Sequence, residues 1–229
     1  MAYSLVLAIF LAYLPIYFWL KFFLKWDKEK PEPFKWLLLI FFLGILCTPL
    51  IYHLQSFFHF SYFNQNLNLF FVSLIEEIFK LLIPFLVLKK NKYFDEAFDG
   101  IIYLIVFGLG LAFIENIGIT IEELVSNHSF SNVFLYLFLR FLGANLLHAL
   151  TGGLLGYFFA LYLIKKKASF LFLGLIFSSL AHWFFNFLMI NFSLTTFIIG
   201  LAFFGVIMSL LFKFGQILKS IKKPIQYPF

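Results

Sequence analysis

The sequence has few charged residues. Asp, Glu, Lys and Arg make up 12% of its 229 residues, whereas 63% are hydrophobic and the mean hydropathy is +0.98. A chain of this length cannot hide so much apolar surface in a water-soluble core, so it must use lipid as part of its solvent. The composition therefore excludes a soluble globular domain and indicates an integral membrane protein surrounded by the lipid bilayer.

Cysteine is almost absent, and the single Cys47 excludes an intrachain disulfide framework. Basic residues are also missing ahead of the first apolar run, and no small-residue cleavage site follows that run. We therefore expect it to remain in the protein as a helix rather than to be removed as a signal peptide. The sequence shows no internal repeat and no low-complexity tract, and we interpret residues 1–229 as one integral membrane domain.

Seven apolar segments each have about the 20 residues that a ~30 Å hydrocarbon layer requires. They predict an all-α fold, a polytopic membrane bundle with seven transmembrane helices. The segments are Tyr3–Phe23, Trp36–Phe57, Leu67–Leu88, Phe98–Thr120, Asn132–Ile164, Phe170–Phe192 and Thr195–Leu218. The fifth is too long for a simple crossing, so we expect its first turns to lie along the interface or to tilt strongly.

Lysine and arginine are distributed unevenly between the ends of these segments. Fifteen of the seventeen lie at alternate ends: Lys21, Lys25, Lys28, Lys30, Lys35, Lys89, Lys90, Lys92, Lys165, Lys166, Lys167, Lys213, Lys219, Lys222 and Lys223. The positive-inside rule then predicts the N-terminus outside and the C-terminus inside. The net charge of +6 is accounted for by this topology and by contact with anionic lipid, so nucleic acid is not implied as a partner.

Several ionisable residues fall inside the predicted spans. Such groups cost several kcal/mol at membrane depth unless they are paired or hydrated, so they indicate a functional site. They are Glu76, Glu77, Lys80, Glu115, Arg140, His148 and His182. At ~1.5 Å per residue from the inner boundary, Glu76 and His182 lie at a depth of ~18 Å and His148 and Glu115 at ~24–25 Å. This shared layer, in the outer half of the bilayer, predicts one hydrated cavity.

Structural explanations compete with this prediction for some of these residues. Glu76 and Lys80, at i and i+4, could be a neutralised internal pair. Glu77 would then remain unexplained, and adjacent carboxylates on a helix point about 100° apart, so one could pair with Lys80 while the other faces a cavity. Arg140 is interpreted as a residue that snorkels to the interface near a helix end.

Four motifs follow one another along the central part of the chain. They are "EEIFK" from Glu76, "FDGIIYLIVFGLGLAFIEN" from Phe98, "HALTGG" from His148 and "HWFFN" from His182. In this order, with Asp-Gly at the start of the fourth segment, they closely resemble the PrsW family of intramembrane proteases, a relative of the CAAX-protease and bacteriocin-processing group. The resemblance covers the motif-bearing core at residues 67–192.

The resemblance implies a protease in the bacterial cytoplasmic membrane that cuts a single-pass membrane protein near the outer face. The family's namesake activity is the first cleavage of a membrane-bound anti-sigma factor. Carried over residue by residue, the implied site consists of Glu76, Glu77, Glu115, Asn116, His148, His182 and Asn186. CAAX relatives have a His where this chain has Glu115, so their division of roles does not transfer directly.

The chemistry of these residues suits peptide hydrolysis. Glu76 or Glu77 suits the general base, and His182 with Asn186 suits the donors to the oxyanion. His148, His182 and Glu77 form a candidate ligand set for catalytic Zn²⁺. A metal-free mechanism based on Glu and His is the alternative, because the spacing is not HExxH.

A proton- or ion-coupled transporter is the competing function, since it would also bury Glu, His and Lys in a midplane cavity. Such a transporter is expected to show inverted repeats or paired broken helices, and the sequence has no evident sign of either.

Overall fold

The computed structural model of the protein describes residues 2–57, 64–88, 91–126 and 130–221. The described residues form α-helices and one 3₁₀ turn and contain no strand. The elements are α1 (Ala2–Leu24), η1 (Lys25–Asp27), α2 (Phe34–Phe57), α3 (Gln65–Leu88), α4 (Asp99–Val125), α5 (Phe130–Leu142), α6 (Ala144–Lys165), α7 (Ser169–Ile190) and α8 (Leu194–Ser220). The predicted all-α class is confirmed.

Among the described residues, six helical segments are long and apolar enough to cross a membrane, with Ser131–Lys165 counted as one segment. The 24-residue α3 is not among them, and it carries Glu76, Glu77 and Lys80. The number of seven crossings therefore stays a prediction. Lys89, Lys90, Lys222 and Lys223, which contribute to the predicted topology, lie outside the described residues.

The long fifth segment is divided into two helices. α5 ends at Leu142 and α6 begins at Ala144, and between them Gly143 leaves the helical conformation with φ −106° and ψ −100°. A Cβ at Gly143 would lie 3.0 Å from the ring of Phe185, so a larger residue would crowd α7 at this break. The excess length that the sequence showed is accommodated by a separate helix, α5, which precedes the 22-residue α6.

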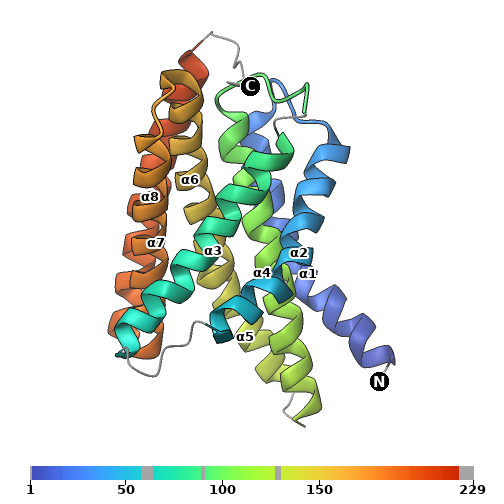
Figure 1. Ribbon diagram of the computed structural model, residues 1–229. Coiled ribbons are helices and arrows are strands. Elements are labelled where there is room, and N and C mark those ends of the chain that lie inside the picture. The colour runs from blue at the N-terminus through green and yellow to red at the C-terminus, as the bar shows by residue number, and fades with distance from the viewer. Residues whose placement is uncertain (1, 58–63, 89–90, 127–129, 222–229) are drawn as a thin grey trace.

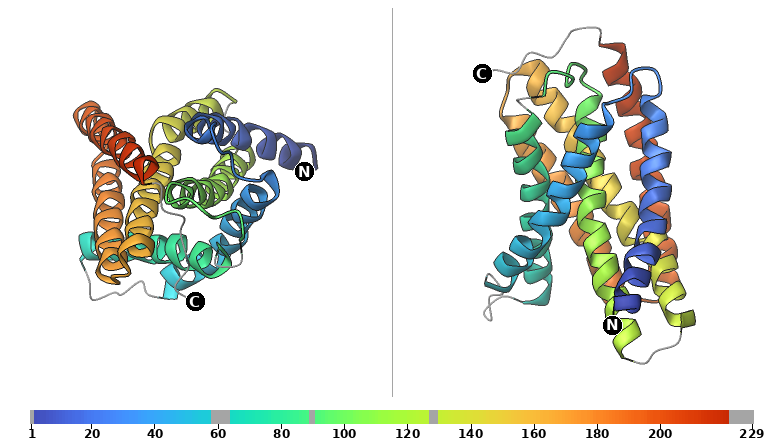
Figure 2. Two further views of the ribbon diagram at one scale, coloured as in Figure 1. Left: turned by 90° about the horizontal axis from the view of Figure 1, so that it is seen from above. Right: turned by 90° about the vertical axis from the view of Figure 1, so that its right-hand side faces the viewer.

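α4 lies at the centre of the bundle and packs against α6, α2 and α1 (Figure 2, left). All residues from Ile101 to Ala112 are buried, which is why this helix is apolar on every side. α6 approaches it closely, because a Cβ at Gly152 would lie only 2.5 Å from the carbonyl oxygen of Leu104. This backbone contact fixes the register between the helices that carry Glu115 and His148.

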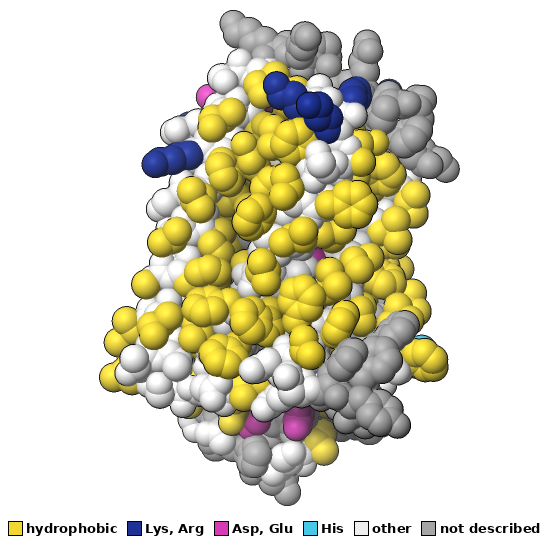
Figure 3. Space-filling model, turned by 60° about the vertical axis from the view of Figure 1, so that its left-hand side comes forward, with side chains coloured by type: hydrophobic (Ala, Val, Ile, Leu, Met, Phe, Trp, Pro, Cys, Tyr) yellow, Lys and Arg dark blue, Asp and Glu magenta, His cyan; other side chains and the backbone are white. Residues whose placement is uncertain are grey.

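The outer surface has a broad apolar band. Figure 3 shows hydrophobic side chains over most of one face, with Lys and Arg side chains near its upper end and acidic side chains near its lower end. In Figure 1 the first turn of α1 and the last turn of α8 lie at opposite ends of the bundle. The band is the surface that lipid would cover.

Candidate active site

Two adjacent glutamates of α3 are both buried and have different partners. The fully buried Glu77 accepts a hydrogen bond from Lys80 Nζ at 2.6 Å, and its Oε1 lies 2.8 Å from His182 Nδ1. Lys80 is also fully buried and donates to Thr151 Oγ1 on α6 at 2.9 Å. The buried ion pair is therefore Glu77–Lys80 at i,i+3, and not the Glu76–Lys80 pair considered from the sequence.

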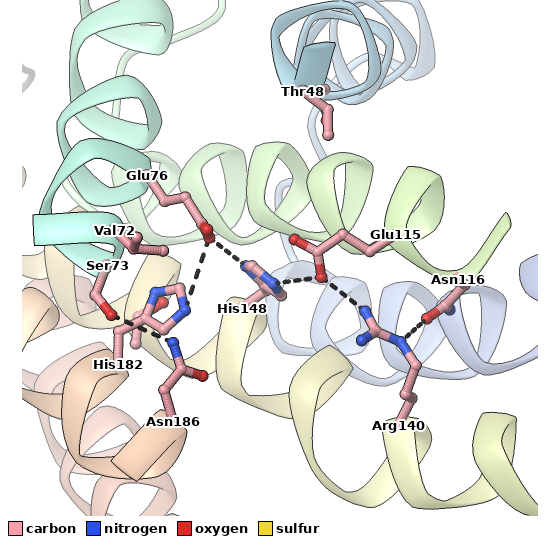
Figure 4. Close-up of polar contacts among 12 residues, drawn as sticks. Thr48, Val72, Ser73, Glu76, Glu115, Asn116, Arg140, His148, His182 and Asn186 are labelled. Atoms are coloured by element: carbon pink, nitrogen blue, oxygen red, sulfur yellow. Dashed lines mark hydrogen bonds and ion pairs between the residues drawn. The ribbon is translucent and has the colours of Figure 1, made fainter. Parts of the chain in front are cut away.

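Glu76 faces the histidines instead. Its Oε1 accepts a hydrogen bond from Gln55 Nε2 of α2 at 2.8 Å. Its Oε2 is buried and has no hydrogen-bond partner within the described part of the chain. This oxygen lies 3.7 Å from His182 Nε2 and 4.0 Å from His148 Nδ1, so it is directed between the two rings (Figure 4).

Each histidine is held by a carboxylate through its other ring nitrogen. His148 Nε2 lies 3.2 Å from Glu115 Oε2, and His182 Nδ1 lies 2.8 Å from Glu77 Oε1. A carboxylate can only accept, so the nitrogen beside it carries the proton and the opposite nitrogen presents a lone pair. His148 Nδ1 and His182 Nε2 therefore both present acceptor lone pairs toward Glu76.

These three acceptors fit a metal ion. Ligand atoms of Glu76, His148 and His182 lie within 4.8 Å of one another. Three lone pairs that converge in a buried site repel one another unless a cation or a proton lies between them. Two His and one carboxylate are a known ligand set for catalytic zinc, and carboxylates that orient the histidines usually accompany it.

The carboxylate in this cluster differs from the one expected. The sequence predicts Glu77 as the carboxylate beside the two histidines, whereas the structure places Glu76 with them. Glu77 is turned toward Lys80 and His182 Nδ1, where it orients one histidine. The roughly 100° rotation between neighbours on a helix allows both arrangements, and the sequence does not say which glutamate faces the cavity.

Arg140 of α5 belongs to the same network, although the sequence predicts that it snorkels to the interface. Its Nη2 donates to Glu115 Oε2 at 2.7 Å and its Nε donates to Asn116 Oδ1 at 2.5 Å (Figure 4). Asn116 in turn donates to the carbonyl oxygen of Ala12 on α1. The signal that could have indicated this role is Glu115 itself, since a carboxylate inside an apolar span requires a counter-charge.

Two asparagines adjoin the site in different ways. Asn186, expected as an oxyanion donor, lies on α7 one turn after His182 and donates to Ser73 Oγ of α3 at 3.3 Å. Asn145, one turn before His148 on α6, is fully buried, and neither of its amide atoms has a partner among the described residues. The expected residues thus converge from α3, α4, α6 and α7, with Asn116 and Asn186 at the two sides of the network.

The fold and this cluster define a polytopic membrane protein whose internal site has the residue types of a hydrolytic centre. The family described as PrsW family intramembrane metalloprotease matches residues 32–212. The chain belongs to this family, and it is an intramembrane protease. The family resemblance of the four motifs is thereby confirmed.

Two curated relatives are similar over most of their length. A protein named Protease PrsW from Oceanobacillus iheyensis is 32% identical over 180 residues, which is 75% of this chain and 79% of the relative. A protein of the same name from Clostridioides difficile is 30% identical over 192 residues, 78% of this chain and 77% of the relative. The solved structures contain no significant match to this chain.

Proposed function

We propose that this protease cuts a single-pass membrane protein near the outer face of the bacterial cytoplasmic membrane, with Glu76, His148 and His182 holding Zn²⁺. The observation that carries the proposal is the convergence of Glu76 Oε2, His148 Nδ1 and His182 Nε2, of which the first two have no hydrogen-bond partner among the described residues. Family membership favours a protease over the transporter considered from the sequence.

The chain's own residues hold the site in a fixed arrangement. Glu77 and Glu115 fix the tautomers of His182 and His148, and Arg140 holds Glu115 in place. Lys80 neutralises Glu77, so this carboxylate remains an acceptor for His182. Zinc, when bound, would supply a Lewis acid that polarises the scissile carbonyl.

In the metal-free alternative, Glu76 accepts a proton from the attacking water. Glu76 Oε2 is a buried carboxylate oxygen without a partner in the described part of the chain, so it has the capacity to accept that proton. The content of bound metal distinguishes the two mechanisms.

The depth of the site determines where a substrate can be cut. Counted at ~1.5 Å per residue from the lysine-rich end, the cluster lies ~18–25 Å into a ~30 Å layer. A transmembrane helix resists cleavage because its carbonyls are hydrogen-bonded within the helix, whereas its last turn leaves several of them free. We therefore propose a cut at or just beyond the frayed outer end of a single-pass helix, and the family resemblance suggests a membrane-bound anti-sigma factor as the substrate.

The test uses purified protein reconstituted with candidate single-pass substrates. Mass spectrometry of the fragments should place the cuts near the outer end of the substrate span, and elemental analysis should find about one zinc per chain. Glu76→Gln should lose both cleavage and zinc, while Glu122→Gln, which changes an exposed carboxylate of α4, should keep both. Cleavage without metal would support the metal-free mechanism, and cuts at the lysine-rich end of the span would contradict the depth argument.

A further inference from the structure

Three buried carboxylates gather at the end of the bundle away from the active site. Asp27 lies in η1, Glu32 in the connection between α1 and α2, and Asp99 is the first residue of α4. Their exposed fractions are 2%, 8% and 1%. Figure 1 shows this connection and the start of α4 at the end of the bundle where α8 finishes. Sixteen positions along α4, or ~24 Å, separate Asp99 from Glu115.

The nearby lysines are engaged with other groups. Lys30 pairs with Asp95 at 2.7 Å and with Glu96 at 3.2 Å, both on the more exposed side of the cluster. Lys219 donates to the carbonyl oxygen of Trp26. Within the described residues, Asp27, Glu32 and Asp99 make no ion pair with Lys or Arg at 4.0 Å or less, so their buried charge lacks a directly bound cation.

The neighbouring polar groups hold two of these carboxylates in place. Tyr103, one turn after Asp99 on α4, donates to Glu32, and Asn91 donates to the Tyr103 hydroxyl at 2.8 Å. One oxygen of Asp99 accepts from the backbone amides of Asp95 and Glu96 at 3.0 and 2.8 Å. This support fixes Glu32 and Asp99 before any ligand binds.

Asp27 supplies a separate indication of a ligand. Its Oδ2 is buried and has no hydrogen-bond partner in the described part of the structure. The carboxylate also contributes an oxygen to a group in which ligand atoms of Asp27, Glu32 and Asp99 lie within 4.8 Å of one another. Asp27 is therefore a buried carboxylate that has one unpartnered oxygen and lies beside two more carboxylates, which is unfavourable without a cation.

We infer that Asp27, Glu32 and Asp99 bind a hard divalent cation, Mg²⁺ or Ca²⁺, that ties the end of α1 to the start of α4. The three ligand groups are carboxylates with no histidine or cysteine, which is the chemistry that Mg²⁺ and Ca²⁺ prefer and zinc does not require. Oxygens on opposite sides of Ca²⁺ lie roughly 4.6–5.2 Å apart, so three oxygens within 4.8 Å of one another can bind the same ion. The site is therefore distinct in position and in chemistry from the Glu/His cluster.

The competing occupant is a proton shared between carboxyl groups. Burial raises the pKa of Glu32, which favours its neutral form. A shared proton would make stability depend on pH and leave it insensitive to divalent cations, whereas a bound cation stabilises the fold by mass action.

The test is a cation titration of the full chain, purified and treated with EDTA. Mg²⁺, Ca²⁺ or Mn²⁺ at constant ionic strength should raise Tm by roughly 5 °C at saturation. Electron paramagnetic resonance should detect bound Mn²⁺ in the wild type and in Glu76→Gln. Asp27→Asn and Glu32→Gln should weaken Mn²⁺ binding by ~10-fold or more. Asp95→Asn, which changes the exposed partner of Lys30, is the matched control and should bind normally.

Several results would overturn the inference. The first is a wild-type Tm that depends on pH but not on any of the three cations. That result would indicate a shared proton, and because it uses the wild type it does not depend on whether a variant folds. Another is Mn²⁺ binding that survives in both Asp27→Asn and Glu32→Gln. A third is binding lost only in Glu76→Gln, which would place the ion in the active site and leave the proposed protease function intact.

Discussion

At the scale of the residue, neighbouring glutamates have different roles because a helix separates them by rotation. Glu77 is paired with Lys80 and orients His182, while Glu76 presents an unpartnered oxygen to both histidines. Arg140, for which the sequence predicts a position at the interface, has a supporting role like that of Glu77, because it neutralises and positions Glu115. Each charged residue of the proposed site thus either faces the two histidines or holds a residue that does.

The Glu77–Lys80 pair allows stability and activity to be separated. Glu77→Gln leaves a fully buried ammonium without its anion, so it should cost about 3–5 kcal/mol of unfolding free energy. The double variant Glu77→Gln/Lys80→Met removes both charges and should recover most of that loss. Activity should remain about 10–100-fold below wild type in both variants, because His182 has lost the carboxylate that orients it.

Thermal unfolding and cleavage rates of the single and double variants measure the two effects. Glu122→Gln on the exposed side of α4 should match the wild type in both. Equal destabilisation of the single and double variants would argue against the buried pair, and restored activity in the double variant would argue against an orienting role for Glu77.

At the scale of the element, small residues between α4 and α6 set how closely the helices approach. A Cβ at Gly152 would contact the Leu104 carbonyl oxygen at 2.5 Å, and one at Gly108 would contact the His148 carbonyl oxygen at the same distance. The 3.2 Å contact between Glu115 and His148 spans these two helices. The spacing of the backbones therefore decides whether the carboxylate reaches the imidazole.

Gly152→Ala tests this spacing. The added methyl group should push the helices apart and destabilise the protein by about 1–3 kcal/mol, and cleavage should fall because Glu115 no longer holds His148. The control is Gly118→Ala on α4, where an added Cβ has nothing within 4 Å, and it should leave stability unchanged or raise it by up to about 1 kcal/mol. Thermal unfolding and activity assays compare the two, and equal effects would contradict the role of the close contact.

At the scale of the whole molecule, the apolar band and the lysine-rich end describe how the bundle would sit in a bilayer. The proposed active site lies toward the end of α4 away from Asp99, and the proposed cation site lies at its start. The orientation of the bundle in the membrane therefore decides which compartment each site faces. The prediction of that orientation rests on the distribution of lysine in the sequence.

Single cysteines can test this topology. In a Cys47→Ser background, Ser126→Cys at the end of α4 should react with an impermeant thiol reagent added to intact cells. Lys166→Cys at the end of α6 should react only after the membrane is permeabilised, because the positive-inside rule places it in the cytoplasm. The reverse pattern would invert the predicted sidedness and the proposed site of cleavage.

The sequence by itself determined the membrane class, the all-α fold and the residues gathered at the site. Hydropathy is a local sum over about 20 residues, so it predicts the apolar segments without knowledge of their neighbours. Charges and histidines inside apolar helices are equally visible in the sequence. Glu76, Glu77, Glu115, His148 and His182 could therefore be named in advance, and the structure brings them together.

Only the tertiary structure decided which of these residues contact each other. The choice of Glu76 over Glu77, the pairing of Arg140 with Glu115 and the break at Gly143 depend on the rotation and register of packed helices. Asp27 and Glu32, in the stretch that follows α1, also meet Asp99 at the start of α4 only because these two distant segments fold together. Rotation and register are set by close backbone contacts between elements distant in the chain, and local composition does not encode them.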